Sequence, residues 1–595
     1  MKPKLLLSAA TGAIALAGFS VSTLPAVEDE AAPFLHPLLM ARTLCGDNPD
    51  ALAKRRQFFV SAARAYAAEQ PAAANATGAL TPALGDISYS ISTDSREAQD
   101  WFNQGLAYVY GFNHGQAVKA FKQAQEIDPS CAMCFWGEAF ALGPNINAPM
   151  GEDANAPAYA AYEKAFAVRD KASEKERALI NALSYRYSAA APEDRTKLDN
   201  AFADAMDAVA LEYPEDDFIA ALAAEANMDT QAWDYWEDSG RTPKGRTART
   251  VSLLEGVLDR NPQYTAAIHL YIHITEASRD PYRALPHADR LADLTPGLGH
   301  LIHMPSHTYY RVGQFKKSLA HNVRAVDVDQ RYLDSADASI LYEYGYFTHN
   351  IHFAMTSAQM AGDGETAMRM AKKLNEKLPI DMAAAAPWVQ PIKAAPYYAM
   401  VQFADPDTIM ALEDPGDEMP FLQGAWRYAR GEAAAAKGNA DMARREAEAI
   451  SAIVAEADLS NLTDGGVPAL DILNIARLTV LARASAQDGD LATAIEAMEA
   501  ADDLQANIAY TEPPYWYYPV KQTLAAYLLE AGHTERAEQT FLEALTKSPN
   551  NAWVLHGLAE TYTAQGDKNG AKYARGLFKD AWLGDKKSTP EMSRL

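Results

Sequence analysis

Apolar and small residues recur along much of this chain every three or four positions, in paired stretches separated by short polar turns. A clear example runs from about Ala98 to Cys131, where large and small side chains follow one another: Trp101, Gly105, Tyr108, Ala117, Phe121, Ala124 and Pro129. Small residues let two antiparallel helices approach, aromatic residues fill the gap between them, and Pro129 ends the second helix because proline cannot continue one. The pattern predicts a helix-turn-helix unit.

The unit returns further along the chain. A second copy runs from about Tyr518 to Asn551 and places Leu524, Ala525, Leu528, Ala537, Phe541, Ala544 and Pro549 in the same order, and another begins at Ala552. Counting back from Pro296 and Pro379 places further units at about 265–298, 299–332 and from 348 onwards. In this order of residue sizes, and in its period of 34, the chain resembles the tetratricopeptide-repeat (TPR) superfamily.

The resemblance implies an all-α fold, a right-handed superhelix or α-solenoid of tetratricopeptide-like repeats. Such folds mostly serve as binding scaffolds. Two positions depart from the pattern, because Ile272 and Met355 stand where a small residue is usual, and we expect wider helix packing there. The repeat signal fades around a run of prolines, which predicts an irregular link before helices resume near Leu422: Pro387, Pro391, Pro396, Pro406, Pro415 and Pro420.

Six segments are therefore expected. They are a signal peptide (1–26), an irregular N-terminal extension (27–95), N-terminal TPR-like repeats (96–264), His-rich TPR-like repeats with a metal site (265–380), an irregular link followed by helical repeats (381–517), and C-terminal TPR repeats (518–595).

The first residues predict export. Lys2 and Lys4 precede an apolar stretch from Leu5 to about Val21, and cleavage is expected near Ala26. This places the protein in a periplasm or outside the cell, with no membrane span after cleavage. A formal charge of −25 argues against nucleic acid as a partner, because its phosphates are held mainly by Lys and Arg.

Histidines carry the strongest chemical signal. Nine of the thirteen fall between His269 and His352. His269 and His273 are followed by His303 and His307 at an offset of 34 residues, one repeat period. Their steps of three and four, shared by Glu276 and His300, keep each set on one helical face. His349 and His352 repeat the His300/His303 spacing after 49 residues, one period plus an insertion of fifteen.

In proteins that resemble this one, the first helix of each repeat lines the concave groove through its second, fifth, ninth and twelfth positions. These histidines and Glu276 fall on such positions, so the resemblance implies that they face the groove. Imidazoles from neighbouring helices could then converge on one or two ions. We expect six metal ligands, namely His269, His273, His303, His307, His349 and His352, with Glu276 and His300 as catalytic acid/base candidates.

The identity of the metal is less constrained. Imidazole suits copper, zinc and iron, and we rank copper slightly above zinc and then iron, on compartment and imidazole number. The alternative reading is a polar groove in which the histidines bind a substrate, or each other, without metal.

Three cysteines are too few for a disulfide scaffold. Cys131 and Cys134 form a CAMC sequence, for which a disulfide, local or with Cys45, competes with a thiol pair that handles soft metals.

Three functions remain open. The first is a secreted metalloenzyme, in which copper would imply oxidation and zinc would imply hydrolysis with Glu276 as base. The second is a protein that binds and delivers metal, using the CAMC thiols. The third is a non-catalytic, peptide-binding scaffold of the cell envelope. The expected partners are accordingly a metal ion and a small-molecule or peptide ligand in the groove.

Overall fold

The computed structural model describes residues 80–595 except 238, 337, 387–388 and 586–588. The expected signal peptide (1–26), most of the expected extension (27–79) and Cys45 therefore lie outside the described residues. Residues 80–95 contain turns and bends but no helix.

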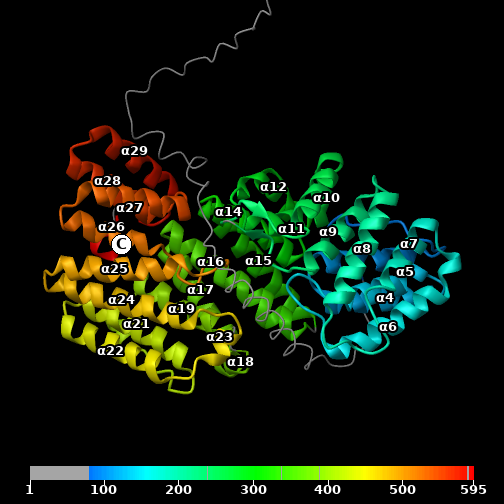
Figure 1. Cartoon of the computed structure of the whole chain (residues 1–595), viewed down its shortest axis with the longest axis horizontal. Coiled ribbons are helices and arrows are strands. Elements are labelled where there is room, and N and C mark those ends of the chain that lie inside the picture. The colour runs from blue at the N-terminus through cyan, green and yellow to red at the C-terminus, as the bar shows by residue number, and fades with distance from the viewer. Residues whose placement is uncertain (1–79, 238, 337, 387–388, 586–588) are drawn as a thin grey trace, which may run out of the picture.

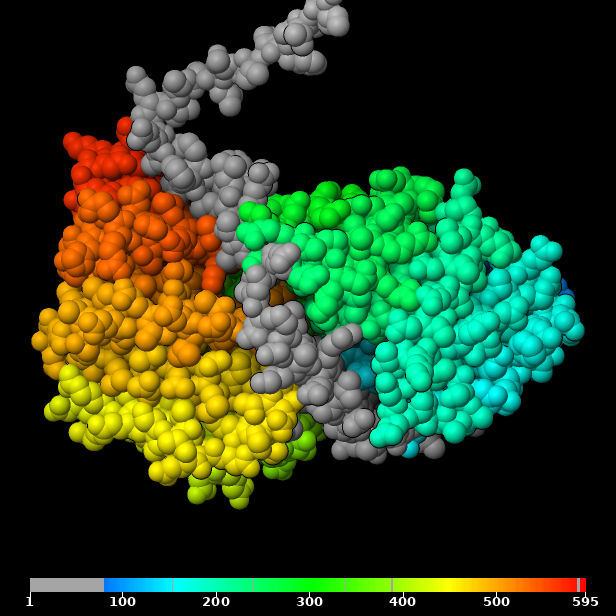
Figure 2. Space-filling model, viewed as in Figure 1, coloured from blue at the N-terminus to red at the C-terminus, as the bar shows by residue number. Residues whose placement is uncertain are grey.

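The described chain is an all-α superhelix, as the repeat pattern predicts. In Figure 1 successive helices stack from the cyan N-terminal end through the green middle to the yellow and red C-terminal end. Figure 2 shows the same path as two masses side by side, one cyan to green and the other yellow to red. Among the described residues, no helix combines the length and apolar character needed to cross a membrane.

The N-terminal helices are α3 (Arg96–Tyr110), α4 (His114–Ile127), α5 (Ala132–Ala141), α6 (Glu152–Ala167), η2 (Arg169–Lys171), α7 (Glu174–Leu183), α8 (Thr196–Glu212), α9 (Asp217–Asp229) and α10 (Thr247–Arg260). Between α9 and α10, strands β1 (Trp236–Glu237) and β2 (Thr242–Pro243) form an antiparallel pair.

The middle of the chain contains α11 (Thr265–Glu276), η3 (Pro281–Ala284), α12 (Leu285–Leu294), α13 (Gly299–His303), α14 (Pro305–Arg311), α15 (Phe315–Ser335), the π-helix η4 (Leu341–Phe347), α16 (Thr348–Ala361) and α17 (Gly364–Lys377). The predicted units at 265, 299 and 348 thus begin at helix starts. The long α15 and the π-helix that runs into α16 accommodate the insertion before His349.

The C-terminal part contains α18 (Ile380–Ala385), α19 (Gln390–Phe403), α20 (Pro406–Met410), α21 (Pro420–Ala436), α22 (Ala440–Glu456), α23 (Ser460–Asp464), α24 (Ala469–Gln487) and α25 (Leu491–Ala506). It ends with α26 (Val520–Glu530), α27 (Thr534–Lys547), α28 (Ala552–Gln565), α29 (Lys568–Ala581) and η6 (Met592–Arg594).

Small residues do bring helices together where the pattern predicts. A Cβ atom on Gly105 of α3, or on Gly137 of α5, would lie 2.5 Å from the Phe121 ring of α4. In the C-terminal repeats a Cβ on Gly557 of α28 would lie 2.3 Å from the ring of Phe541 in α27. These distances are shorter than van der Waals contact, so only glycine permits the packing.

The proline-rich region is more helical than expected. Pro391, Pro406 and Pro420 stand in the first turn of α19, α20 and α21, and Pro396 lies within α19. Proline suits a first helical turn because its φ is already helical and the missing N–H would have no partner there. The expected irregular link is therefore limited to short connections, such as the one around Pro415 between α20 and α21.

Candidate metal centre

Four helices of the His-rich repeats supply the histidines. Helix α11 carries His269 and His273, α13 carries His300 and His303, α14 carries His307, and α16 carries His349 and His352. The first five of these are at most 4% exposed, and His349 is partly exposed. The predicted groove histidines are thus largely shielded from water, and aromatic rings such as Phe112 and Phe353 pack against them.

The first cluster comprises His269, His273 and His300, whose candidate ligand atoms lie within 4.8 Å of one another. The Nε2 atoms of His269 and His300 are 3.2 Å apart. Phe112, from the turn after α3, packs on all three rings, with centroid distances of 4.6, 6.0 and 5.2 Å. We call this set the first histidine cluster.

The second histidine cluster comprises His303, His307 and His349, again with candidate ligand atoms within 4.8 Å. The Nε2 atoms of His303 and His307 are 2.9 Å apart. Two ligands on one tetrahedral ion, each about 2.0–2.1 Å from it, are roughly 3.3 Å from one another. The His269–His300 separation of 3.2 Å is close to this value and the His303–His307 separation of 2.9 Å is somewhat shorter, while the third histidine of each cluster lies within 4.8 Å.

The two clusters adjoin. Ring centroids are 5.7 Å apart between His273 and His307 and 5.9 Å apart between His300 and His303. Glu276 connects them, because its Oε1 lies 3.2 Å from His273 Nδ1 and its Oε2 lies 2.6 Å from His307 Nδ1. One carboxylate therefore orients a histidine of each cluster.

Hydrogen bonds at Nδ1 orient three of the cluster histidines so that Nε2 points towards the other histidines. His303 Nδ1 lies 2.6 Å from Oδ1 of Asn322, and Glu276 occupies Nδ1 of His273 and His307. The backbone carbonyl of Tyr110 accepts a hydrogen bond from His269. Acceptors of this kind fix the tautomer of metal-binding histidines in metalloproteins.

Three buried histidine nitrogens have no hydrogen-bond partner among the described residues: Nε2 of His273 and Nδ1 of His300 in the first cluster, and Nδ1 of His352 outside both clusters. Burying a polar atom without a partner is unfavourable, by about 1–3 kcal/mol. A metal ion in the first cluster could satisfy Nε2 of His273. It could not bind both nitrogens of His300, which already directs Nε2 towards His269.

Burial shapes the protonation of the clusters. It lowers the pKa of four imidazoles well below the ordinary value, and neighbouring histidines lower it further: His269, His300, His303 and His349. They are therefore neutral, the form that binds metal. Burial also disfavours protonation of His307, but the charge and hydrogen bond of Glu276, with those of Glu512, raise its pKa to about 10. Burial disfavours ionisation of Glu276, yet His307 and His273 outweigh it and lower its pKa.

A distant segment closes the site, and the sequence pattern missed its key residue. Glu512, from the connection between α25 and α26, places Oε2 3.4 Å from His307 Nδ1, and it forms a third group of candidate ligands with Glu276 and His307. The other oxygen, Oε1, lies 3.9 Å from Nε of Arg311, so both buried oxygens have a positively charged neighbour. Burial nevertheless raises the pKa of Glu512 to about 7. The aromatic PPYWYYP sequence (513–519), which directly follows Glu512, is the feature of this segment that stands out in the sequence.

His352 does not join either cluster. Its Nε2 lies 2.9 Å from the hydroxyl of Tyr517, and burial lowers its pKa to about 3. Of the predicted ligands, the structure brings together five, His269, His273, His303, His307 and His349, and adds His300, which was assigned to acid/base chemistry.

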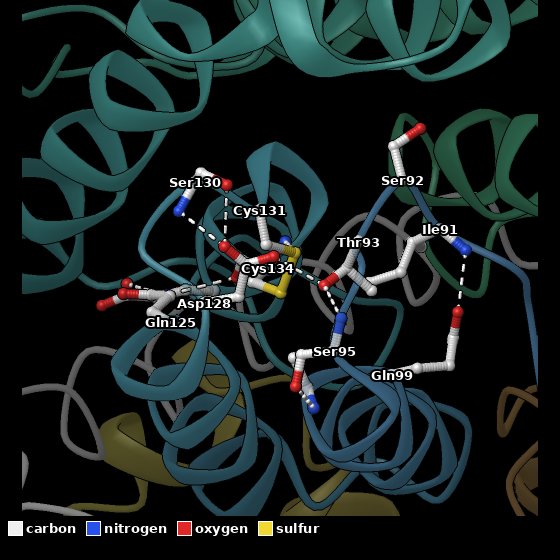
Figure 3. The surroundings of a disulfide bond; sticks show 12 residues. Ile91, Ser92, Thr93, Ser95, Gln99, Gln125, Asp128, Ser130, Cys131 and Cys134 are labelled. Atoms are coloured by element: carbon white, nitrogen blue, oxygen red, sulfur yellow. Dashed lines mark hydrogen bonds between the residues drawn. A yellow bond between two sulfur atoms is a disulfide. The ribbon is translucent and has the colours of Figure 1, made fainter.

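Cys131 and Cys134 form a disulfide at the start of α5, away from both clusters. Figure 3 shows its surroundings, in which Asp128 binds Ser130 and Thr93. Both cysteines are fully buried. The local disulfide, one of the alternatives open from the sequence, is the pairing in the structure.

A cavity of about 470 Å³ lies beside the second cluster. Glu512 and Tyr310 line it together with Tyr510, whose hydroxyl is 3.4 Å from Oε2 of Glu276. The centre thus has a neighbouring space of the size that small ligands occupy.

Comparison with known proteins supports the repeat assignment. Family models described as tetratricopeptide repeat match residues 99–131 and 528–572, the two segments with the clearest pattern. The chain carries tetratricopeptide repeats. No curated protein matches.

Solved structures share only a loose likeness with this TPR chain. A human IFIT1 dimer with m7Gppp-AAAA is 12% identical, with 82% of this chain and 95% of that chain covered and a TM-score of 0.30. The APC/C hetero-tetramer Cut9–Hcn1 is 13% identical over 81% and 76% of the two chains, with a TM-score of 0.29. Yeast Tom70 is 11% identical over 82% and 90%, with a TM-score of 0.25. At these TM-scores the superpositions support no argument about function.

Proposed function

We propose that this TPR protein is a metalloprotein that holds two transition-metal ions, one in each histidine cluster. The observation that carries the proposal is the pair of adjoining three-histidine groups, each with ligand atoms within 4.8 Å. Two features support it: buried nitrogens that have no partner among the described residues, and hydrogen-bond acceptors placed at Nδ1. Both are expected of metal-binding imidazoles in the absence of the ion.

We further propose that the protein is an enzyme, with copper-dependent oxidation ranked above zinc-dependent hydrolysis. Six imidazoles without a thiolate suit copper and zinc, and iron remains compatible. Copper would supply redox chemistry, whereas zinc would activate water. The adjacent cavity supports catalysis over storage, because a storage or structural site has no need of ligand access.

The two glutamates take different roles in this proposal. Both oxygens of Glu276 are engaged by ligand histidines, so Glu276 positions them and is a poor candidate for a base. Glu512 lines the cavity and places Oε2 3.4 Å from Nδ1 of His307. We assign proton transfer, or completion of the coordination shell, to Glu512.

Export to a periplasm or the exterior is part of the proposal and rests on Lys2, Lys4 and the apolar stretch that follows. N-terminal sequencing of the mature protein from its own compartment tests it. A start near residue 27 supports export, whereas a start at Met1 contradicts it.

A second candidate, the peptide-binding scaffold, is favoured by the repeats themselves and by the aromatic walls of the cavity. Metal delivery through the CAMC thiols has less support, since those sulfurs are buried in a disulfide.

Elemental analysis of protein purified without chelator or affinity metal separates these functions. We expect about two equivalents of metal per chain, and roughly half or less in the double variant His303→Ala/His307→Ala. The control is His287→Ala/His321→Ala, which removes two partly exposed histidines outside both clusters. Circular dichroism must show that helix content is kept. Absence of metal after reconstitution with copper or zinc would overturn the proposal and leave the scaffold.

A further inference from the structure

The cavity beside the second histidine cluster has three kinds of lining. Aromatic side chains form its walls, including Tyr310, Trp516 and Tyr517, which are buried. Glu512 is a buried carboxylate of the lining and lies next to His307. Two cationic side chains that line it, Arg241 and Lys547, are exposed and therefore belong to its rim.

Each kind of lining selects a chemical feature. Flat aromatic walls favour an aromatic ring, by stacked or edge-on contacts worth about 0.5–1.5 kcal/mol each beyond burial. Glu512 lines the cavity, and its contacts to His307 and Arg311 are long, at 3.4 and 3.9 Å, so the carboxylate can still accept a hydrogen bond from a ligand. The rim cations favour an anionic group on the opposite end of the ligand.

An aromatic pocket with one buried carboxylate could also select an organic cation. Two observations argue against it here. Arg311 lines the cavity, with Nε 3.9 Å from Oε1 of Glu512 and its guanidinium 5.1 Å from the ring of Tyr510. The formal charge of the lining is therefore positive, with Arg241, Arg311 and Lys547 against Glu512.

We propose that this cavity binds a small phenolic acid, with the ring between the aromatic walls, the hydroxyl at Glu512 and the acidic group at Arg241 and Lys547. A single ring with a short acidic side chain suits a volume of about 470 Å³. In this orientation the hydroxyl carbon lies at the end of the molecule nearest His307. That the bound molecule is a substrate rests on the proposed metal centre, whereas the binding itself does not.

The test is calorimetric titration of metal-free and metal-loaded protein with three probes: 4-hydroxyphenylacetate, phenylacetate and tyramine. We expect 4-hydroxyphenylacetate to bind most tightly in both forms. Phenylacetate, which lacks the hydroxyl, and tyramine, which replaces the acid by an amine, should each bind about tenfold more weakly. Tighter binding of tyramine, or no binding of any probe, would overturn the proposal.

Two variants test which protein side chain contacts the hydroxyl of the ligand and which contacts its acidic group. Glu512→Gln should remove most of the preference for 4-hydroxyphenylacetate over phenylacetate and keep the preference for an acid over an amine. Lys547→Glu should do the reverse, and Lys372→Glu, an exposed lysine of α17, is its control. Unchanged probe preferences in both pocket variants would place the ligand elsewhere and overturn the assignment.

Metal content, measured in the same samples, separates the two proposals. Selective binding by protein that cannot be loaded with metal would refute the metal centre and leave the pocket. Stoichiometric metal without selective binding would do the opposite.

Discussion

Helices α3 and α11 are each the first helix of a repeat, yet they bury different side chains. In α3 nine of fifteen residues are buried, and none of them carries a charge or an imidazole: Ala98, Trp101, Phe102, Gly105, Leu106, Ala107, Tyr108, Val109 and Tyr110. In α11 every residue is buried, including His269, His273, Thr275 and Glu276. A buried polar group without a partner is costly, so α11 is compatible with folding only if its polar groups bind one another or a ligand. We infer that ordinary repeats supply stability, whereas the histidine repeats supply the site.

The largest expected effect comes from a substitution that disrupts an ordinary repeat. Phe121 is fully buried and packs against Gly105 and Gly137. Phe121→Ala should lower the free energy of unfolding by about 3–5 kcal/mol through the cavity it leaves, without changing the metal content of the folded protein. Urea denaturation and elemental analysis measure the two quantities, with the exposed Tyr573→Ala as control. Loss of metal from the folded variant would show that the two regions are not separable.

Asp329 gives the next effect, a dependence of stability on pH. Burial raises its pKa from 3.8 to about 7, against hydrogen bonds from Tyr342 and Asn350 that lower it. Below pH 4 the carboxyl is protonated in both states. As the pH rises towards 7 the unfolded chain loses this proton first, so the stabilisation present at low pH is lost.

The difference in unfolding free energy between the natural chain and Asp329→Asn should therefore fall by up to about 4 kcal/mol from pH 4 to pH 7 and then level off. Urea titrations of both proteins across this range give the difference. A difference that stays constant or rises with pH would show that the pKa of Asp329 is not raised in the fold.

Within the candidate metal centre, Glu276→Gln tests whether a buried polar side chain of α11 serves metal binding. An amide has one acceptor oxygen, so it can orient His273 or His307 but not both. Metal affinity should fall about 10–100-fold, while helix content is kept. Competition with a coloured chelator measures affinity, and Glu255→Gln, at a half-exposed carboxylate of α10 paired with Arg283, is the matched control. Equal losses in both variants would refute a specific role for Glu276.

The smallest effect is expected at Asn322, which orients one cluster histidine, His303, through a hydrogen bond at Nδ1. Asn322→Ala should weaken metal binding about tenfold, the lower end of the effect of such outer partners. The same competition assay applies, with Asn474→Ala on α24 as control. If this variant weakens binding more than Glu276→Gln does, the two clusters do not share Glu276 as described.

Sequence patterns within one helix-turn-helix unit predicted the helix contacts that are made within that unit. Small residues opposite aromatic ones, as at Gly105 and Phe121, located the repeats, and the repeat period placed histidines of separate helices together. Contacts made across long sequence distances were beyond reach. Glu512 reaches His307 from 205 positions away, the difference of the two residue numbers, and no period relates them. His352 was grouped with His349 by spacing alone, yet packing turns it towards Tyr517.

Anomalous X-ray diffraction from crystals of metal-loaded protein tests the central claim most directly. The account predicts two peaks at the absorption edge of the bound metal, one among His269, His273 and His300 and the other among His303, His307 and His349. No peak at either cluster, with metal present in the crystal, would contradict it.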